Sequence, residues 1–314
     1  MLSFSYVRTG PRLESHLKPS IIVHGGAGSG RYAKNDRRYG GLEGAVEAGL
    51  SAMKKGSGID EVVAAVRSME DSGLFNCGRG ACLTAEGKAE LDAAVMSAER
   101  LAGAGVGNVT CTHNPVALAR WVMENTEHVL IVGERCRDYA KLAGIRVEEL
   151  TPSAQALERF RALRGKAPYR SNLRLVRRFR TGDTVGAAAV GADGVPAAAV
   201  STGGRWMKLP GRVGDSAILG AGVFAGTGGA ASATGSGEDI IRVSLSMKAV
   251  ELVSRAGAAG GATKAIQMVT KARGEGTAGI VTVDSKGRVG AAYNTESMGR
   301  AWWDREKGRT VATF

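Results

Sequence analysis

The spacing of apolar residues in the first half of the chain predicts both strands and helices. Residues 20–28 (SIIVHGGAG) are β-branched and run into glycines, which is typical of a strand ending in a turn. Residues 42–56 and 60–70 repeat apolar side chains at helical spacing, and residues 114–125 begin with an Asn-Pro pair that favours a helix start. Residues 128–133 (HVLIVG) predict a further buried strand. This half therefore predicts layered α/β structure.

The second half differs in composition and is dominated by small residues. Residues 185–202 predict a hairpin of two strands joined at an Asp-Gly turn, and residues 278–295 predict a second hairpin. Residues 238–257 predict the longest helix of the chain. Alanine and glycine in the strands would allow neighbouring layers to approach closely.

Composition narrows the class of protein. The chain has 314 residues, of which 44% are hydrophobic and 46 are glycine, and it contains no apolar run long enough to span a bilayer. The first 20 residues lack the continuous apolar segment of a secretory signal. The four cysteines show no C-x-x-C spacing and no clustering with histidine, so zinc is not expected. A cytoplasmic protein with reduced thiols is the expectation.

The net charge of +12 is concentrated in one segment. Residues 157–181 hold nine Lys and Arg against one acid, so the remainder of the chain carries only +4. An arginine-rich segment can bind nucleic acid, and a nucleic-acid-binding protein is one alternative function. Few aromatic residues accompany the charges, which argues against that alternative. We interpret residues 150–183 as a flexible basic linker that does not need to pack.

Familiar catalytic motifs are absent. The glycine-rich stretches 24–30 and 220–226 match neither a phosphate-binding P-loop nor a dinucleotide fingerprint. His24-Gly-Gly is similar to an esterase oxyanion loop, but the chain has no G-x-S-x-G nucleophile motif. A Ser-His-Asp enzyme is therefore not expected.

Threonine offers another nucleophile. An N-terminal threonine can use its own α-amine as the base, because the pKa of that group is about 7.7–8. Thr184 follows Asp183 and precedes a predicted strand, so it could act in this way only after scission of the Asp183–Thr184 bond. The alternative is that Thr184 is an ordinary strand residue.

The order of several motifs supports the nucleophile. GDTVGAAAV, STGG, LPGRVGDSAILGAG and SATGSGE follow one another, and HGGAG and LFNCGRGACLTAEGKAELDAAVM precede them. Together they resemble the plant-type asparaginase/isoaspartyl peptidase family of N-terminal-nucleophile hydrolases, over roughly residues 20–145 and 182–300. The resemblance implies a four-layer αββα sandwich. It also implies self-cleavage into an α-subunit (1–183) and a β-subunit (184–314) that form one structural domain.

The resemblance assigns roles to individual residues. Thr184 matches the nucleophile, Thr202 the threonine that polarises it, and Asn76 an asparagine near it. Thr234 and Gly235 match the oxyanion hole. The α-carboxylate and α-ammonium of the substrate would be held by Arg212 and Asp215, in a pocket lined by Gly235 and Gly237. No cofactor is expected, except that the loop Met69–Arg79 resembles a structural sodium site; the carbonyls implied are those of Met69, Glu70, Ser72, Phe75, Cys77 and Arg79.

These matches predict hydrolysis of L-asparagine and of β-aspartyl dipeptides by a dimer of αβ units. The alternative enzyme is glycosylasparaginase, which shares the Asp-Thr scission site and the Arg and Asp residues that bind the substrate. The STGG motif favours the peptidase. Three residues depart from the family pattern: Cys77, Arg205 and Trp206 stand where smaller or polar residues are common. They make the selectivity of the pocket an open question.

Overall fold

The structure is a computed structural model that describes residues 20–28, 36–53, 57–166, 181–182 and 184–314. The strands are β1 (Ser20–Gly28), β2 (Leu91–Ser97), β3 (Gly103–Val109), β4 (Leu130–Val132), β5 (Thr181–Gly182), β6 (Val185–Val190), β7 (Pro196–Thr202), β8 (Val223–Gly226), β9 (Gly229–Gly235), β10 (Ala278–Asp284), β11 (Val289–Tyr293), β12 (Ser297–Asp304) and β13 (Arg309–Thr313). The helices are α1 (Arg37–Met53), α2 (Gly58–Ser72), α3 (Pro115–Asn125), α4 (Cys136–Leu142), α5 (Ala154–Lys166), α6 (Gly237–Val243) and α7 (Leu245–Arg273).

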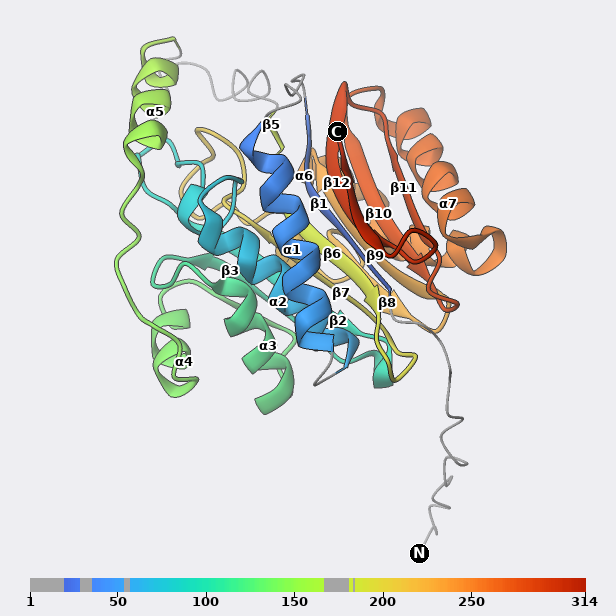
Figure 1. The fold of residues 1–314 in the computed structure, drawn as a ribbon. Coiled ribbons are helices and arrows are strands. Elements are labelled where there is room, and N and C mark those ends of the chain that lie inside the picture. Colours follow the sequence, from blue (N-terminus) through green and yellow to red (C-terminus); the bar gives the residue numbers. More distant parts are fainter. Residues whose placement is uncertain (1–19, 29–35, 54–56, 167–180, 183) are drawn as a thin grey trace, which may run out of the picture.

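Two sheets stack face to face between layers of helices (Figure 1). The larger sheet has the strand order β13-β12-β1-β6-β7-β2-β3-β4, with β5 also paired to β1. The smaller sheet has the order β11-β10-β9-β8. Helices α1, α2 and α3 cover the outer face of the large sheet, and α7 covers the outer face of the small one. The predicted αββα sandwich is confirmed.

Strand β6 shows how the sequence builds the central layers. Its alanines alternate between two apolar cores: Ala187 and Ala189 pack toward the helices, whereas Ala188 and Val190 pack between the sheets. The side-chain period of a strand is two, so a strand buried on both faces needs an unbroken apolar run. Small side chains here keep the two sheets close together, as the composition predicted.

Two elements differ from the sequence prediction. The predicted helix 238–257 is broken at Ser244, whose left-handed backbone (φ 49°) ends α6 and begins α7. At the predicted end, Gly257 (φ 72°) kinks α7, which then continues to Arg273. No glycine or proline stands at residue 244, so the pattern gave no sign of the break. The predicted strand at 128–133 exists as β4, but it is not buried. Leu130 and Val132 are each 50% exposed because β4 lies at the end of the sheet.

The interpretation of residues 150–183 as an unpacked linker is wrong for its first part. Residues 154–166 form helix α5, and Ala156 and Phe160, one helical turn apart, are buried. Gly87 makes room for the ring, since a Cβ at that position would lie 3.1 Å from Phe160 Cε1. Residues 167–180 and 183 lie outside the described residues. Ala156 and Phe160 are spaced as an apolar pair on one helix face, but the many basic residues around them obscured this pattern in the sequence.

We expect Phe160→Ala to destabilise the protein by about 3 kcal/mol, because removing a buried aromatic ring leaves a cavity. Urea denaturation measures the difference in free energy of unfolding. Arg161→Ala, an exposed change on the same helix, is the matched control. Equal stability of Phe160→Ala and the control would contradict the packing described for α5.

None of the helices in the described part of the chain is long and apolar enough to cross a membrane.

Candidate active site

Thr184 and Thr202 meet at the ends of two adjacent strands. The antiparallel register of β6 and β7 pairs Val185 with Ser201, so Thr184 and Thr202 are the next positions on the two strands. Their side-chain oxygens lie 3.0 Å apart, and both residues are buried. This distance is that of a hydroxyl–hydroxyl hydrogen bond. The predicted nucleophile therefore has the predicted partner beside it.

Asn76 holds the turn that follows Thr202. The Gly204 N–H donates to Thr202 Oγ1 at 2.9 Å, and the Asn76 amide donates to the Gly204 carbonyl at 2.7 Å. Asn76 Oδ1 in turn accepts the Cys82 N–H at 2.8 Å. Because Thr202 Oγ1 accepts from the main chain, its own proton is available to Thr184 Oγ1. Asn76 thus acts on Thr202 through the turn.

Thr234 and Gly235 end strand β9 in the opposite sheet. Thr234 is fully buried, and its hydroxyl accepts the Ala27 N–H at 3.3 Å. Gly235 has φ 136°, and a Cβ there would lie 2.3 Å from the Thr277 carbonyl oxygen. Only glycine fits this backbone. These residues lie on the strand that packs against β6, across the gap between the sheets.

Arg212 and Asp215 converge on Gly237. A Cβ at Gly237 would lie 2.6 Å from both Arg212 Nη2 and Asp215 Oδ1. The two side chains can therefore come this close to residue 237 only because it is glycine. The buried Asp215 Oδ2 has no hydrogen-bond partner among the described residues. Burial raises the pKa of Asp215 to about 7 against the opposing charge of Arg212. A buried carboxyl with one unpartnered oxygen is suited to receive a cation.

Contacts connect this pair with the two threonines. Gly204, whose N–H binds Thr202, packs against Arg212: a Cβ at Gly204 would lie 3.3 Å from Arg212 Nη1. Thr184, Thr202, the turn at Gly204 and Arg212 therefore form one continuous site. Contacts connect the predicted residues Asn76, Asp215 and Gly237 to it, whereas Thr234 and Gly235 are placed only on the strand that packs against β6.

Glu238 is a member of the site that sequence reasoning missed. Its carboxylate lies 3.0 Å from Arg212 Nη2 and 3.2 Å from Arg205 Nη1. Burial would raise the pKa of Glu238, but the guanidiniums of Arg212 and Arg205 outweigh it and hold the pKa below its usual value. In the sequence Glu238 looks like an ordinary acid in the first turn of a helix.

Asp92 was also missed, although it directly supports the loop that carries Arg212 and Asp215. Its carboxylate accepts the Gly214 N–H at 2.9 Å and the Asn108 N–H at 3.0 Å. Nearby, Glu90 accepts the Gly211 N–H through its side chain and the buried Lys208 ammonium, at 2.8 Å, through its main chain. The available signal was a lone acid inside the apolar strand LDAAVM.

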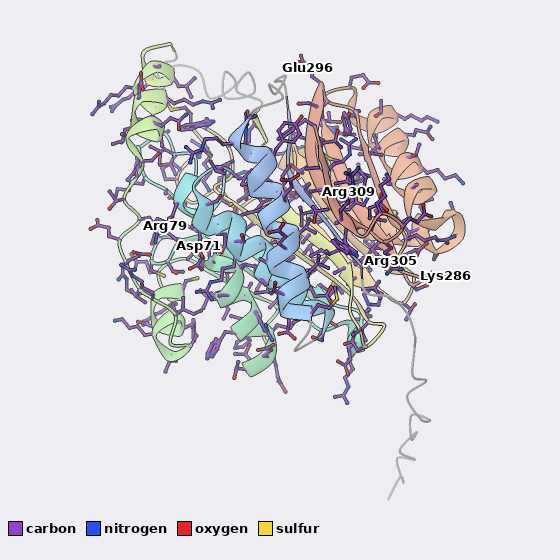
Figure 2. The ribbon with its side chains drawn as sticks, in the orientation of Figure 1. Asp71, Arg79, Lys286, Glu296, Arg305 and Arg309 are labelled. Atoms are coloured by element: carbon purple, nitrogen blue, oxygen red, sulfur yellow. The ribbon has the colours of Figure 1, made fainter. Side chains whose placement is uncertain are left out.

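The loop after α2 packs main-chain carbonyls closely against two glycines. Gly78 and Gly80 pack so tightly that a Cβ would lie 2.4 Å from the Glu70 carbonyl at the first and 2.1 Å from the Phe75 carbonyl at the second. The Met69 carbonyl accepts the Ser72 hydroxyl, and the Cys77 carbonyl accepts the Gly80 N–H. Arg79 and Asp71, labelled in Figure 2, lie near the C-terminal end of α2, and the Arg79 side chain pairs with Glu148 at 3.7 Å.

The three departures from the family pattern have defined surroundings. Burial raises the pKa of the Cys77 thiol well above its usual value, so Cys77 is an inert core residue. Arg205 pairs with Glu238, as described above. Trp206 is buried, and the guanidinium of Arg159 from α5 lies 5.0 Å from its ring centre. Helix α5 therefore contacts the residue next to Arg205. Asp183, on the predicted scission bond, lies outside the described residues.

Comparison with known proteins agrees with this geometry. The asparaginase family model matches residues 17–313. A plant-type L-asparaginase of Pyrobaculum calidifontis is 42% identical over 295 residues, covering 90% of this chain and 96% of the relative. An isoaspartyl peptidase of Escherichia coli is 38% identical, covering 94% and 99%, and an isoaspartyl peptidase/L-asparaginase of Danio rerio is 34% identical, covering 93% and 94%. The chain belongs to the asparaginase family, and it is an amidohydrolase of the N-terminal-nucleophile type.

Proposed function

We propose that the protein cleaves itself before Thr184 and then hydrolyses L-asparagine to L-aspartate and ammonia, and β-aspartyl dipeptides to aspartate and an amino acid. The observation that carries this function is the single site formed by Thr184, Thr202, Arg212 and Asp215. The names of the relatives support both substrates.

The residues have the following roles. The α-amine of Thr184 takes the proton of the Thr184 hydroxyl, and Oγ1 attacks the side-chain carbonyl of the substrate. Thr202 donates to Oγ1 and orients it. Thr234 and Gly235 stabilise the negative oxygen of the tetrahedral intermediate. Ammonia or an amine leaves with the proton, and water then hydrolyses the β-aspartyl ester on Thr184 to release aspartate.

Charge orients the substrate. The Arg212 guanidinium binds the α-carboxylate, and the Asp215 carboxylate binds the α-ammonium. These two contacts fix the backbone end of the substrate and direct its β-carbonyl to Thr184. The carboxylate of Glu238 occupies one side of Arg212 and keeps that guanidinium in place.

The two alternative functions are not favoured. Glycosylasparaginase would require a pocket for a sugar on the leaving-group side, and the relatives named here are asparaginases and isoaspartyl peptidases. The nucleic-acid alternative rested on the basic segment, part of which packs as α5.

A comparison of three substrates tests the proposal. Purified protein is assayed with L-asparagine, β-aspartyl-leucine and a glycosylasparagine, and the rate of aspartate release is measured for each. We expect turnover of the first two and little of the third. Turnover of the glycosylasparagine alone would reject the proposed function in favour of glycosylasparaginase.

We propose a sodium ion as a structural ligand of the loop Met69–Arg79. The proposal is supported by the packing of main-chain carbonyls in this loop: the Glu70 carbonyl lies against Gly78, and the Phe75 carbonyl, which accepts the Cys77 N–H at 2.8 Å, lies against Gly80. Neutral carbonyl oxygens of this kind suit a monovalent cation. No cluster of three or more His, Cys, Asp or Glu side chains suited to a transition metal occurs among the described residues. We expect the melting temperature to be higher in sodium chloride than in choline chloride at equal ionic strength. Equal melting temperatures would contradict the proposal.

We further propose that two αβ units form a dimer and that the enzyme acts in the cytoplasm. Strand β4 supports association: among the described strands it pairs only with β3, and it exposes Leu130 and Val132. Sedimentation equilibrium tests the dimer, since a monomeric mass at micromolar concentration would contradict it. Fractionation of cells tests the location.

A further inference from the structure

His24 joins the nucleophile to the opposite sheet. It lies on β1 with its side chain fully buried. Its Nδ1 is 3.0 Å from the main-chain oxygen of Thr184, and its Nε2 is 3.0 Å from Ser232 Oγ on β9. The two ring nitrogens therefore link the large sheet to the small one at the nucleophile itself. None of the roles described above uses this residue.

The hydrogen bonds determine the tautomer of the ring. Burial lowers the pKa of His24 to about 3, so the imidazole is neutral and carries one N–H. The Thr184 carbonyl can only accept, so the proton must be on Nδ1. Nε2 is then the acceptor, and the Ser232 hydroxyl donates to it. Ser232 thereby fixes His24 as a donor to Thr184.

The strand pairing explains why Thr184 needs this donor. Strand β1 pairs with β6 up to His24–Gly186 and resumes at Ala27–Gly182 with β5. Between these points β1 bends at Gly26, where φ is 111°. Thr184 therefore has no main-chain pairing with β1. The His24 side chain donates a hydrogen bond to the Thr184 carbonyl instead.

Close packing makes the contact specific. A Cβ at Gly186 would lie 2.0 Å from Ser232 Oγ and 2.5 Å from His24 Nε2. Only glycine at residue 186 leaves room for the hydrogen bond between His24 and Ser232. The imidazole ring is therefore closely packed between the two sheets, and a shift of the ring would disturb that packing.

We propose that His24, oriented by Ser232, is a positioning residue that holds the Thr184 main chain so that the α-amine and Oγ1 keep their reactive geometry. The proposal rests on Thr184 being the nucleophile. After scission Thr184 is a chain end, covalently attached to the fold only through Val185. Fixing its carbonyl fixes the rotation about the Cα–C bond, and this rotation sets where the amine and the hydroxyl point. Misplacement of a reacting group by about 1 Å costs on the order of a hundredfold in rate.

Two substitutions separate the donor from the rest of the ring. In His24→Asn the amide nitrogen stands close to the former Nδ1 and can still donate to Thr184. In His24→Gln the amide stands close to the former Nε2, so it can reach Ser232 but not Thr184. Each protein is tested for the fraction cleaved before Thr184, for kcat and KM with L-asparagine, and for melting temperature.

We expect kcat of cleaved His24→Gln to fall about tenfold or more while KM stays within about twofold. His24→Asn should keep kcat within about threefold of wild type. If both variants lose kcat equally, or neither loses it, His24 is a packing residue and the proposal is wrong.

A third variant covers failure of both His24 variants to fold. Ser232→Ala removes the hydroxyl that fixes the tautomer, so its kcat should fall about threefold to tenfold with KM unchanged. Wild-type kcat in Ser232→Ala would then overturn the proposal. Absence of cleavage before Thr184 in the wild-type protein would instead contradict the proposed function, so the two failures are distinguishable.

Discussion

Thr184→Ala is expected to remain one chain of 314 residues and to have no measurable hydrolytic activity. In the proposed mechanism the hydroxyl attacks the preceding carbonyl during self-cleavage and the substrate carbonyl during turnover, so one substitution removes both reactions. We expect a loss of kcat of at least about a thousandfold. A denaturing gel and N-terminal sequencing measure cleavage: the wild-type protein should give the 183 residues before Thr184 and the 131 residues that begin Thr-Val-Gly-Ala.

Thr184→Ser is the matched control, because it keeps a hydroxyl at the same position. It should cleave itself, though more slowly, and retain part of the activity. Normal cleavage of Thr184→Ala between residues 183 and 184 would show that another group attacks that bond. The assignment of the nucleophile, and with it the mechanism, would then be wrong.

Local pattern was sufficient to predict many of the individual strands and helices, whereas their arrangement in four layers was implied by the family resemblance. The strand at 20–28, the hairpins at 185–202 and 278–295, and the helix at 114–125 are all present, because each has the periodicity and the end signals of its element. The break at Ser244 was not predictable in this way. It depends on how α6 and α7 dock on the small sheet, and no local residue type signals it. Exposure of β4 likewise depends on its place in the sheet order.

The residues of the candidate site also fall into those that could be predicted from local sequence and those that could not. Thr184, Thr202, Arg212 and Asp215 were predicted because they lie in short motifs whose order resembles a known family. His24, Asp92 and Glu238 act through contacts with residues far away in the sequence, such as the bond from His24 to Thr184, 160 positions apart. A single sequence shows a buried polar residue but not its partner. Their roles could be read only from the folded chain.

Asp215→Asn is expected to lower kcat/KM for β-aspartyl-leucine by about a hundredfold and, at the same time, to raise the melting temperature at alkaline pH. The loss follows because the α-ammonium of the substrate loses a charge-assisted hydrogen bond worth up to about 3 kcal/mol. The gain follows from the buried carboxyl, which has one oxygen without a hydrogen-bond partner among the described residues and whose pKa burial raises to about 7 in the folded protein. The folded state then binds the proton more tightly than the unfolded state does. Folding stability therefore falls as pH rises from the unfolded pKa toward 7, and Asn removes this loss.

Melting temperatures of Asp215→Asn and wild type at about pH 4.5 and about pH 8 measure the effect, which should be larger at the higher pH. Asp239→Asn is the matched control, since Asp239 lies on α6 beside Arg273 at 2.7 Å. Burial would raise the pKa of Asp239, but the Arg273 guanidinium outweighs it and holds that pKa below its usual value, so this variant should lose stability at pH 8. Wild-type kcat/KM in Asp215→Asn would mean that another group binds the α-ammonium. A melting temperature unchanged at both pH values would mean that the Asp215 carboxyl has a partner in solution, and the substrate pocket would need a different cation site.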